Sequence, residues 1–251
     1  MKFPRIHPAR RLTILFAVFS MSGCSSDTPV FDTPVSLGEE GLRAHYNFNG
    51  GVNDSGPNGH HGALLGNATA DGSLVIGSNN TDALSLRAAV VDGMSNFAFA
   101  TWVRMDAFHL LPNQLISGST AAEDDNFGIR YESGGDRWAL VLLGETFRLP
   151  VNSTVEDMQW HHIAITTLGG VLFQKGVQLY VDGVAIEPVV PVSYFSALAV
   201  DAGGLIISQD QANVGGGFQE FSSLAGEVDE LRIYDRSLDA GIVSFLYSKG
   251  H

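Results

Sequence analysis

The strongest constraint on the fold of this chain is the stretch Phe221–Asp235, which reads FSSLAGEVDELRIYD. Val228 and Leu231 are both apolar, but in a strand of period 2 they lie on opposite faces. The change of phase falls at Asp229 and Glu230, so either a β-bulge re-aims the chain there or both faces of the strand are covered. Two adjacent carboxylates in the middle of a strand need partners unless they are fully solvated. We therefore look for functional residues first at Asp229 and Glu230.

The first 23 residues are predicted to be an export signal and not part of the fold. A basic segment precedes a short apolar run, Leu12–Ser20, which is too short to span a bilayer. The run ends in Met21-Ser22-Gly23-Cys24, which resembles the lipobox of bacterial lipoproteins, in which the Cys is lipidated and becomes the mature N-terminus. The alternative is an ordinary signal peptide followed by a chance Cys. Cys24 is the only cysteine, which excludes a disulfide within the chain.

Residues 24–41 are rich in Ser, Asp, Thr and Pro and are expected to form a flexible tether after the lipidated Cys. Ser25 follows the Cys where an Asp would mark retention at the inner membrane in such lipoproteins. The expected location is therefore the cell envelope, with the lipid anchor in the outer membrane. Residues 42–251 suit one all-β domain.

The chain is acidic, with 27 Asp and Glu against 14 Lys and Arg and a net charge of −13 at pH 7. Loss of the basic export signal would make the mature chain more acidic still. Such a surface repels phosphate backbones, which argues against nucleic acid as a partner. It remains compatible with cations and with neutral glycans.

The 29 glycines and the scarcity of helix-favouring runs indicate many short strands joined by tight turns. Strands are expected over residues 43–48, 96–104, 114–117, 127–132, 138–143, 160–167, 177–186 and 204–208. Residues 96–104 are apolar at both parities, as in a central strand covered on each side. Asp182 and Gly183 are expected at a hairpin turn. A short helix is expected over Ser237–Ser248, with Ser237 as its cap and Asp239 at its positive end.

The loop Asn49–Gly62, NGGVNDSGPNGHHG, follows the first expected strand. Its Asn, Asp and Gly residues favour turns and bring carbonyl and carboxylate oxygens close together. His60 and His61 are adjacent, so their side chains point apart on an extended chain. No third ligand stands nearby, and a transition-metal site is therefore not predicted.

Five motifs in order, YNFNGGVNDSGPNGHHG, FAFATWVR, WHHIAI, LYVDGVAI and LAGEVDELRIYDRSLDAGIVSFLY, resemble the laminin G-like jelly-roll domains of the concanavalin A-like lectin/glucanase superfamily. The resemblance implies an all-β sandwich of two antiparallel sheets, each of about six or seven strands, with a short C-terminal helix. It also implies a binding or adhesion role more often than catalysis, with carbohydrate or protein ligands. Many such domains carry one calcium ion at a rim of the sandwich.

The leading hypothesis is a surface-anchored binding module for carbohydrate, or for an envelope or extracellular protein. Trp102, Trp138 and Trp160 are able to stack on sugar rings, but each lies in a strand pattern, where core packing is the better prediction. The sequence therefore does not identify the residues that bind the ligand.

Two other classes of function are weighed against this hypothesis. One is a glycoside hydrolase of the same superfold, whose strand carries E-x-D followed by a second Glu. Here Glu227 and Asp229 are present, but the second Glu would fall at Leu231 or Arg232. Retaining hydrolysis needs two carboxyl groups, so no catalytic residue is predicted and the protein is not expected to be an enzyme. The other class is a structural protein of envelope assembly.

A calcium site is predicted at Asn49, Asp54 and Asp229. In the domains that this chain resembles, the first strand lies near the last, which would bring the first loop towards Asp229. Calcium prefers carboxylate, amide and carbonyl oxygens, and it would give Asp229 a cationic partner. The alternative is that Asp54 caps a turn and Asp229 bonds to backbone amides of that loop, with no metal.

Overall fold

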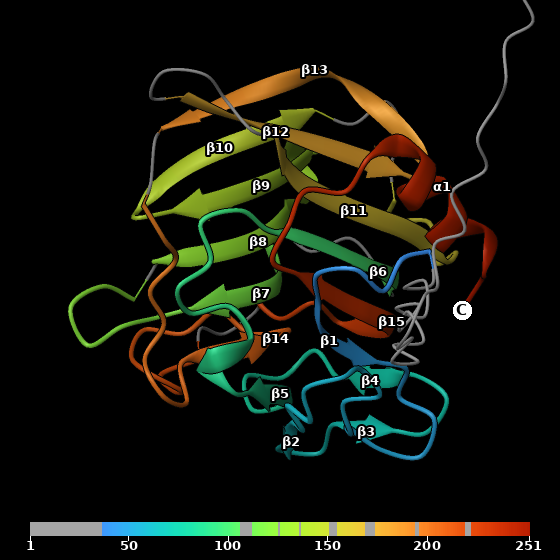
Figure 1. Ribbon diagram of the computed structural model, residues 1–251. Coiled ribbons are helices and arrows are strands. Elements are labelled where there is room, and N and C mark those ends of the chain that lie inside the picture. The colour runs from blue at the N-terminus through green and yellow to red at the C-terminus, as the bar shows by residue number, and fades with distance from the viewer. Residues whose placement is uncertain are drawn as a thin grey trace, which may run out of the picture. The chain divides into compact units, whose positions relative to one another are not determined.

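Figure 1 shows the computed structural model, which describes residues 37–105, 112–124, 126–135, 137–150, 155–168, 174–193, 196–218 and 222–251. The predicted export signal, Cys24 and most of the predicted tether lie outside these residues. Over the ranges just given, the chain contains no helix that is long and apolar enough to cross a membrane.

Two antiparallel sheets form the body of the domain, as the resemblance implies (Figure 1). The first has the order β13-β12-β11-β6-β15-β4-β3, with β1 also paired to β15, so it has eight strands where about six or seven were expected. Its strands are β1 (Leu42–Tyr46), β3 (Thr69–Ala70), β4 (Leu74–Ile76), β6 (Ala98–Met105), β11 (His161–Leu168), β12 (Gln174–Val181), β13 (Val184–Ser193) and β15 (Gly226–Tyr234).

The second sheet has seven strands in the order β10-β9-β8-β7-β14-β5-β2. These are β2 (Ala63–Leu65), β5 (Ala83–Leu86), β7 (Asn113–Gly118), β8 (Phe127–Glu132), β9 (Arg137–Leu142), β10 (Glu145–Pro150) and β14 (Leu205–Ile207). Two 3-10 helices, η1 (Ala88–Val90) and η2 (Ser133–Gly135), lie in the connections.

The main hydrophobic core contains buried side chains from both sheets, among them Val103 and Ile163 of the first and Ile116 and Trp138 of the second. A second, smaller core lies on the other face of the first sheet. Ala98 and Ala100 of β6 belong to it, so the prediction of a strand covered on both faces is confirmed.

The helix α1 (Ala240–Ser248) covers this second core through Ile242, Val243 and Leu246. Its cap is Asp239 and not Ser237, which corrects the predicted start. Asp239 has extended backbone, and its side chain accepts a hydrogen bond of 2.9 Å from the amide of Ile242. A carboxylate here satisfies a free amide of the first turn and also faces the positive end of the helix dipole.

Residues 37–41, which the sequence assigns to the tether, form a turn that contacts the domain. The Tyr234 hydroxyl donates to the carbonyl of Gly38 at 2.9 Å, and the amide of Asp235 donates to the carbonyl of Gly41 at 2.9 Å. Both glycines have positive φ, where they avoid the strain that other residues meet. The ordered contacts of the domain therefore begin before residue 42.

Candidate functional site

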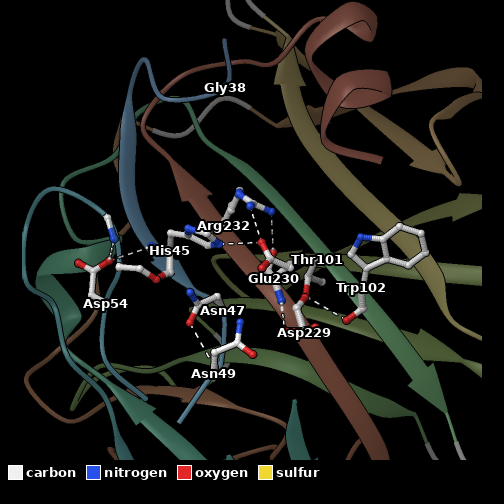
Figure 2. Close-up of polar contacts among 12 residues, drawn as sticks. Gly38, His45, Asn47, Asn49, Asp54, Thr101, Trp102, Asp229, Glu230 and Arg232 are labelled. Atoms are coloured by element: carbon white, nitrogen blue, oxygen red, sulfur yellow. Dashed lines mark hydrogen bonds and ion pairs between the residues drawn. The ribbon is translucent and has the colours of Figure 1, made fainter. Parts of the chain in front are cut away.

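The bulge expected at Asp229 and Glu230 is present in β15, where the register with β6 shifts between Asp229 and Arg232. Glu230 has φ of +50°, in the left-handed region that non-glycine residues seldom adopt. Its Oε2 atom lies 2.8 Å from Nε2 of His45 on β1, and it also pairs with Arg232 (Figure 2). The bulge therefore joins the first strand of the domain to the last through one carboxylate.

Two opposing effects act on the carboxyl group of Glu230. Burial raises its pKa, but the hydrogen bond from His45 and the charge of Arg232 together outweigh burial, so the pKa lies below its ordinary value. Glu230 is thus a partnered anion at neutral pH. Sequence reasoning did not find His45 as its partner. The available signal was parity, because His45 alternates with the buried Ala44 and Tyr46 and must lie on the other face of β1.

Asp229 differs from its neighbour in having few partners. It is only 4% exposed, and its carboxylate accepts one hydrogen bond among the described residues, from the amide of Glu230 at 2.7 Å. Burial raises the pKa of Asp229 to about 6; the backbone hydrogen bond acts against this rise, and the negative charge of Glu230 adds to it. Asp229 is therefore a buried acid whose charge is poorly compensated.

Asp54 organises the first loop by accepting backbone hydrogen bonds. Oδ1 accepts from the amides of His45 at 2.9 Å and Gly56 at 2.7 Å, and Oδ2 accepts from the amide of His60 at 2.8 Å. A Cβ atom on Gly56 would lie 2.9 Å from Oδ1, so glycine leaves the room that this arrangement needs. The amide of Asp54 itself donates to Nδ1 of His61 at 3.1 Å. This is the turn-capping role that the sequence left open.

The three predicted calcium ligands thus have different surroundings. The oxygens of Asp54 accept from three backbone amides, which is the turn-capping arrangement. Asn49 is exposed, and its backbone amide donates to Oδ1 of Asn47 at 3.2 Å (Figure 2). The carboxylate of Asp229 accepts only the one bond described above among the described residues. Within the described part of the chain, no three His, Cys, Asp or Glu side chains converge as a metal-binding group. Of the three predicted ligands, Asn49 is exposed and lines a groove described below, whereas Asp229 is buried with one hydrogen bond to its carboxylate among the described residues.

Glu227, the first carboxylate of the hydrolase-like pattern, is held by two partners on the same face of the sheet. It pairs with Arg104, directly opposite on β6, and its Oε2 accepts a hydrogen bond of 2.8 Å from Ser73. At the positions where a second Glu was sought, Leu231 is buried in the core and Arg232 pairs with Glu230. The pair of free carboxyl groups that retaining hydrolysis requires is not formed by these residues.

A groove of about 920 Å³ lies beside His45, Glu230 and Arg232. Its lining comes from residues 37–42, from His45 and the first loop up to Pro57, from Glu230 and Arg232, and from residues 245–251. Asn49 and Ser55 line one part of it, and Lys249 another. The groove therefore joins polar groups from segments that are far apart in the sequence, which explains why no local pattern predicts it.

The three tryptophans occupy two kinds of environment. Trp138 is fully buried in the main core, as predicted. Trp102 is 8% exposed but lies outside the main core, with its ring 5.4 Å from that of His162 and 5.5 Å from that of Tyr247. Trp160 is only partly buried, so the prediction of core packing is wrong for this residue.

A comparison with family models matches residues 61–244 to the concanavalin A-like lectin/glucanases superfamily. Two relatives among curated proteins each share 30% identity with the chain: "Sushi, von Willebrand factor type A, EGF and pentraxin domain-containing protein 1" of Mus musculus over 148 residues, and neuronal pentraxin-1 of Rattus norvegicus over 116 residues. The matches cover 57% and 45% of this chain, but only 4% and 24% of the relatives.

Solved structures similar to this chain include domain 4 of AbnA, a GH43 extracellular arabinanase from Geobacillus stearothermophilus, in complex with arabinotriose. Its TM-score is 0.58 at 20% identity, over 82% of this chain and 98% of that one. The binding domain of botulinum neurotoxin DC in complex with rat synaptotagmin II has a TM-score of 0.60 at 12% identity, over 85% and 52%. At these identities the likeness shows the fold alone.

Proposed function

Because the chain belongs to the laminin G-like family of the concanavalin A-like lectin/glucanases superfamily, we propose that it is a non-catalytic module that binds a glycan. We further propose that lipid on Cys24 holds the module at the cell envelope. The lack of a second Glu at Leu231 or Arg232, together with the Arg104 and Ser73 partners of Glu227, supports binding over hydrolysis.

The groove is the observation that carries this proposal. Its volume of about 920 Å³ lies at the upper end of the roughly 300–1,000 Å³ typical of sites for small ligands. The side chains of Asn49, Ser55 and Lys249 supply donors and acceptors around it, which suits the many hydroxyl groups of a sugar.

Names of structural neighbours support the same class of ligand. The arabinanase domain is in complex with arabinotriose, and a botulinum neurotoxin DC binding domain is in complex with SialylT. Another neighbour is in complex with the protein synaptotagmin II, so a protein ligand is the second candidate.

We also propose that a calcium ion assists the site through Asn49 and Asp229. A divalent cation would compensate the buried charge of Asp229. Among the described residues, this desolvated carboxylate accepts only one hydrogen bond. The proposal leaves Asp54 in its structural role, holding the loop that carries Asn49.

The test is a glycan-array screen of the full chain, with a parallel pull-down from envelope extract. Ser55→Trp would fill the groove and is expected to abolish glycan binding. Ser78→Trp, at an exposed serine outside the groove, is the matched control and should bind like the native chain. Glycan binding that survives Ser55→Trp would contradict the groove as the site. Binding only to an extracted protein would favour the second candidate.

A further inference from the structure

An aromatic platform, defined by Trp102, Arg104 and Trp160, lies on the face of the first sheet away from the main core. Trp102 and Arg104 are two residues apart on β6 and therefore share a face. The guanidinium carbon of Arg104 lies 5.6 Å from the centre of the Trp160 ring, within the distance of a cation–π contact. The platform therefore combines two indole rings with one cation.

Three buried nitrogen atoms at this platform have no hydrogen-bond partner among the described residues: Nε1 of Trp102, Nε of Arg104 and Nδ1 of His162. His162 is the direct partner of Trp102 in the pairing of β11 with β6, so all three share one face. Burial lowers the pKa of His162 to about 4, so its ring is uncharged at neutral pH. Buried polar groups in folded proteins are usually satisfied, so three unsatisfied nitrogens on one face are a feature that a hydroxyl-rich ligand would explain.

In this structure the ring of Tyr247 stacks on Trp102, and the ring of His251 stacks on Trp160. Its centre lies 4.4 Å from that of Trp160, with the planes inclined by 27°, and 5.4 Å from that of Trp102. His251 also lines the groove described above. The groove and the platform therefore meet at His251, whose ring already stacks on Trp160.

We propose that the platform is a subsite for one neutral sugar ring and that His251 occupies this place until the sugar displaces it. This inference rests on the proposed glycan-binding function and deepens it. The apolar face of a pyranose or furanose ring would stack on Trp160, and its hydroxyl oxygens would accept from Trp102 and Arg104.

The charge of the platform determines which sugar it prefers. Arg104 lies over the ring of Trp160, and Glu227 already neutralises it as an ion pair. Among the described residues that define the platform, the one positive charge is therefore compensated, which leaves little attraction there for a carboxylated or sulfated sugar. A neutral ring meets donors without a charge penalty, so the ligand class is a neutral oligosaccharide.

Tryptophan fluorescence gives a direct test, because the chain has only three tryptophans and Trp138 is buried in the main core. The full chain would be titrated with arabinotriose, cellotriose and maltotriose, and at least one is expected to change the emission. Trp160→Ala should lower the affinity for that sugar about tenfold and reduce the change in emission. His251→Ala should raise the affinity about threefold or more, because no ring has to be displaced.

Met158→Ala is the control for the first variant, since Met158 is 64% exposed and lies in the same segment as Trp160. Thermal melting of every variant verifies folding, and Trp160→Tyr should restore part of the affinity. If a trisaccharide binds but Trp160→Ala and His251→Ala bind it as the native chain does, the platform is not the subsite, although the proposed function stands. If neither the native chain nor His251→Ala binds any of the three sugars, the neutral-sugar subsite is overturned, and the proposed function is overturned as well only if the glycan array is also blank.

Discussion

Asp229→Asn is expected to stabilise the protein at neutral and alkaline pH when calcium is absent. The pKa of Asp229 rises from 3.8 to about 6 on folding, mainly because of burial. A folded-state pKa above the unfolded one means that the folded state binds the proton more tightly. The contribution of this proton to stability is therefore complete below pH 3.8 and is lost as the pH rises through 6.

The size of the effect follows from the shift. A difference of about two units at about 1.4 kcal/mol per unit gives about 3 kcal/mol of stability lost above pH 7. Asparagine carries no charge to desolvate, and its Oδ1 is able to accept the same bond from the amide of Glu230. We therefore expect Asp229→Asn to raise the free energy of unfolding by about 1–3 kcal/mol at pH 8 and to change it little at pH 4.

Urea denaturation of the full chain with a chelator present, at pH 4 and pH 8, measures this difference. Asp71→Asn is the control, because Asp71 is exposed and its substitution removes the same formal charge. A loss of stability that is equal at the two pH values would refute the reasoning, since it would mean that the Asp229 carboxylate is not penalised by burial.

Three further predictions follow from the proposed function. Millimolar calcium should raise the melting temperature of chelator-treated native protein, whereas Asp229→Asn should show a smaller rise; identical curves with and without calcium would contradict the calcium proposal. Cys24→Ser should abolish incorporation of labelled palmitate and release the protein from the membrane fraction, and a variant that stays membrane-bound would count against the anchor. Reducing-sugar release from β-glucans, agars and carrageenans should match a blank, and activity that disappears in Glu227→Gln would show an enzyme.

Much of the fold was predictable because long strands carry strong alternation. The strand expected over residues 127–132 has those bounds in the structure, and the turn at Asp182 and Gly183 lies between β12 and β13. The strands β2 to β5 were missed because each has only two to four residues, too few for a period to appear. The strand β10 was missed because its sequence, ETFRLP, has only Phe147 and Leu149 on an apolar face and ends in a proline, so its period is weak.

The site was predictable only where a local pattern reflects a local cause. The change of phase within Phe221–Asp235 predicted the bulge, because side-chain parity is a property of one strand. The capping role of Asp54 was one of two open alternatives, since the same Asn, Asp and Gly residues suit turns and calcium. The groove and the partnership of His45 with Glu230 depend on pairing between β1 and β15, which are separated by most of the domain.

The arrangement of charge along β15 connects these features. Glu230 has two side-chain partners, His45 and Arg232, whereas the carboxylate of the adjacent Asp229 has one partner among the described residues, a backbone amide. The bulge gives the two carboxylates different surroundings. Glu230 bonds to the first strand through His45, whereas Asp229 is able to accept further hydrogen bonds. Since His251 lines the groove and also covers Trp160, displacement of its ring would join the groove to the Trp160 side of the platform. A neutral oligosaccharide that spans both should therefore bind more tightly than a monosaccharide, because the cost of displacing His251 is met once while the contacts add.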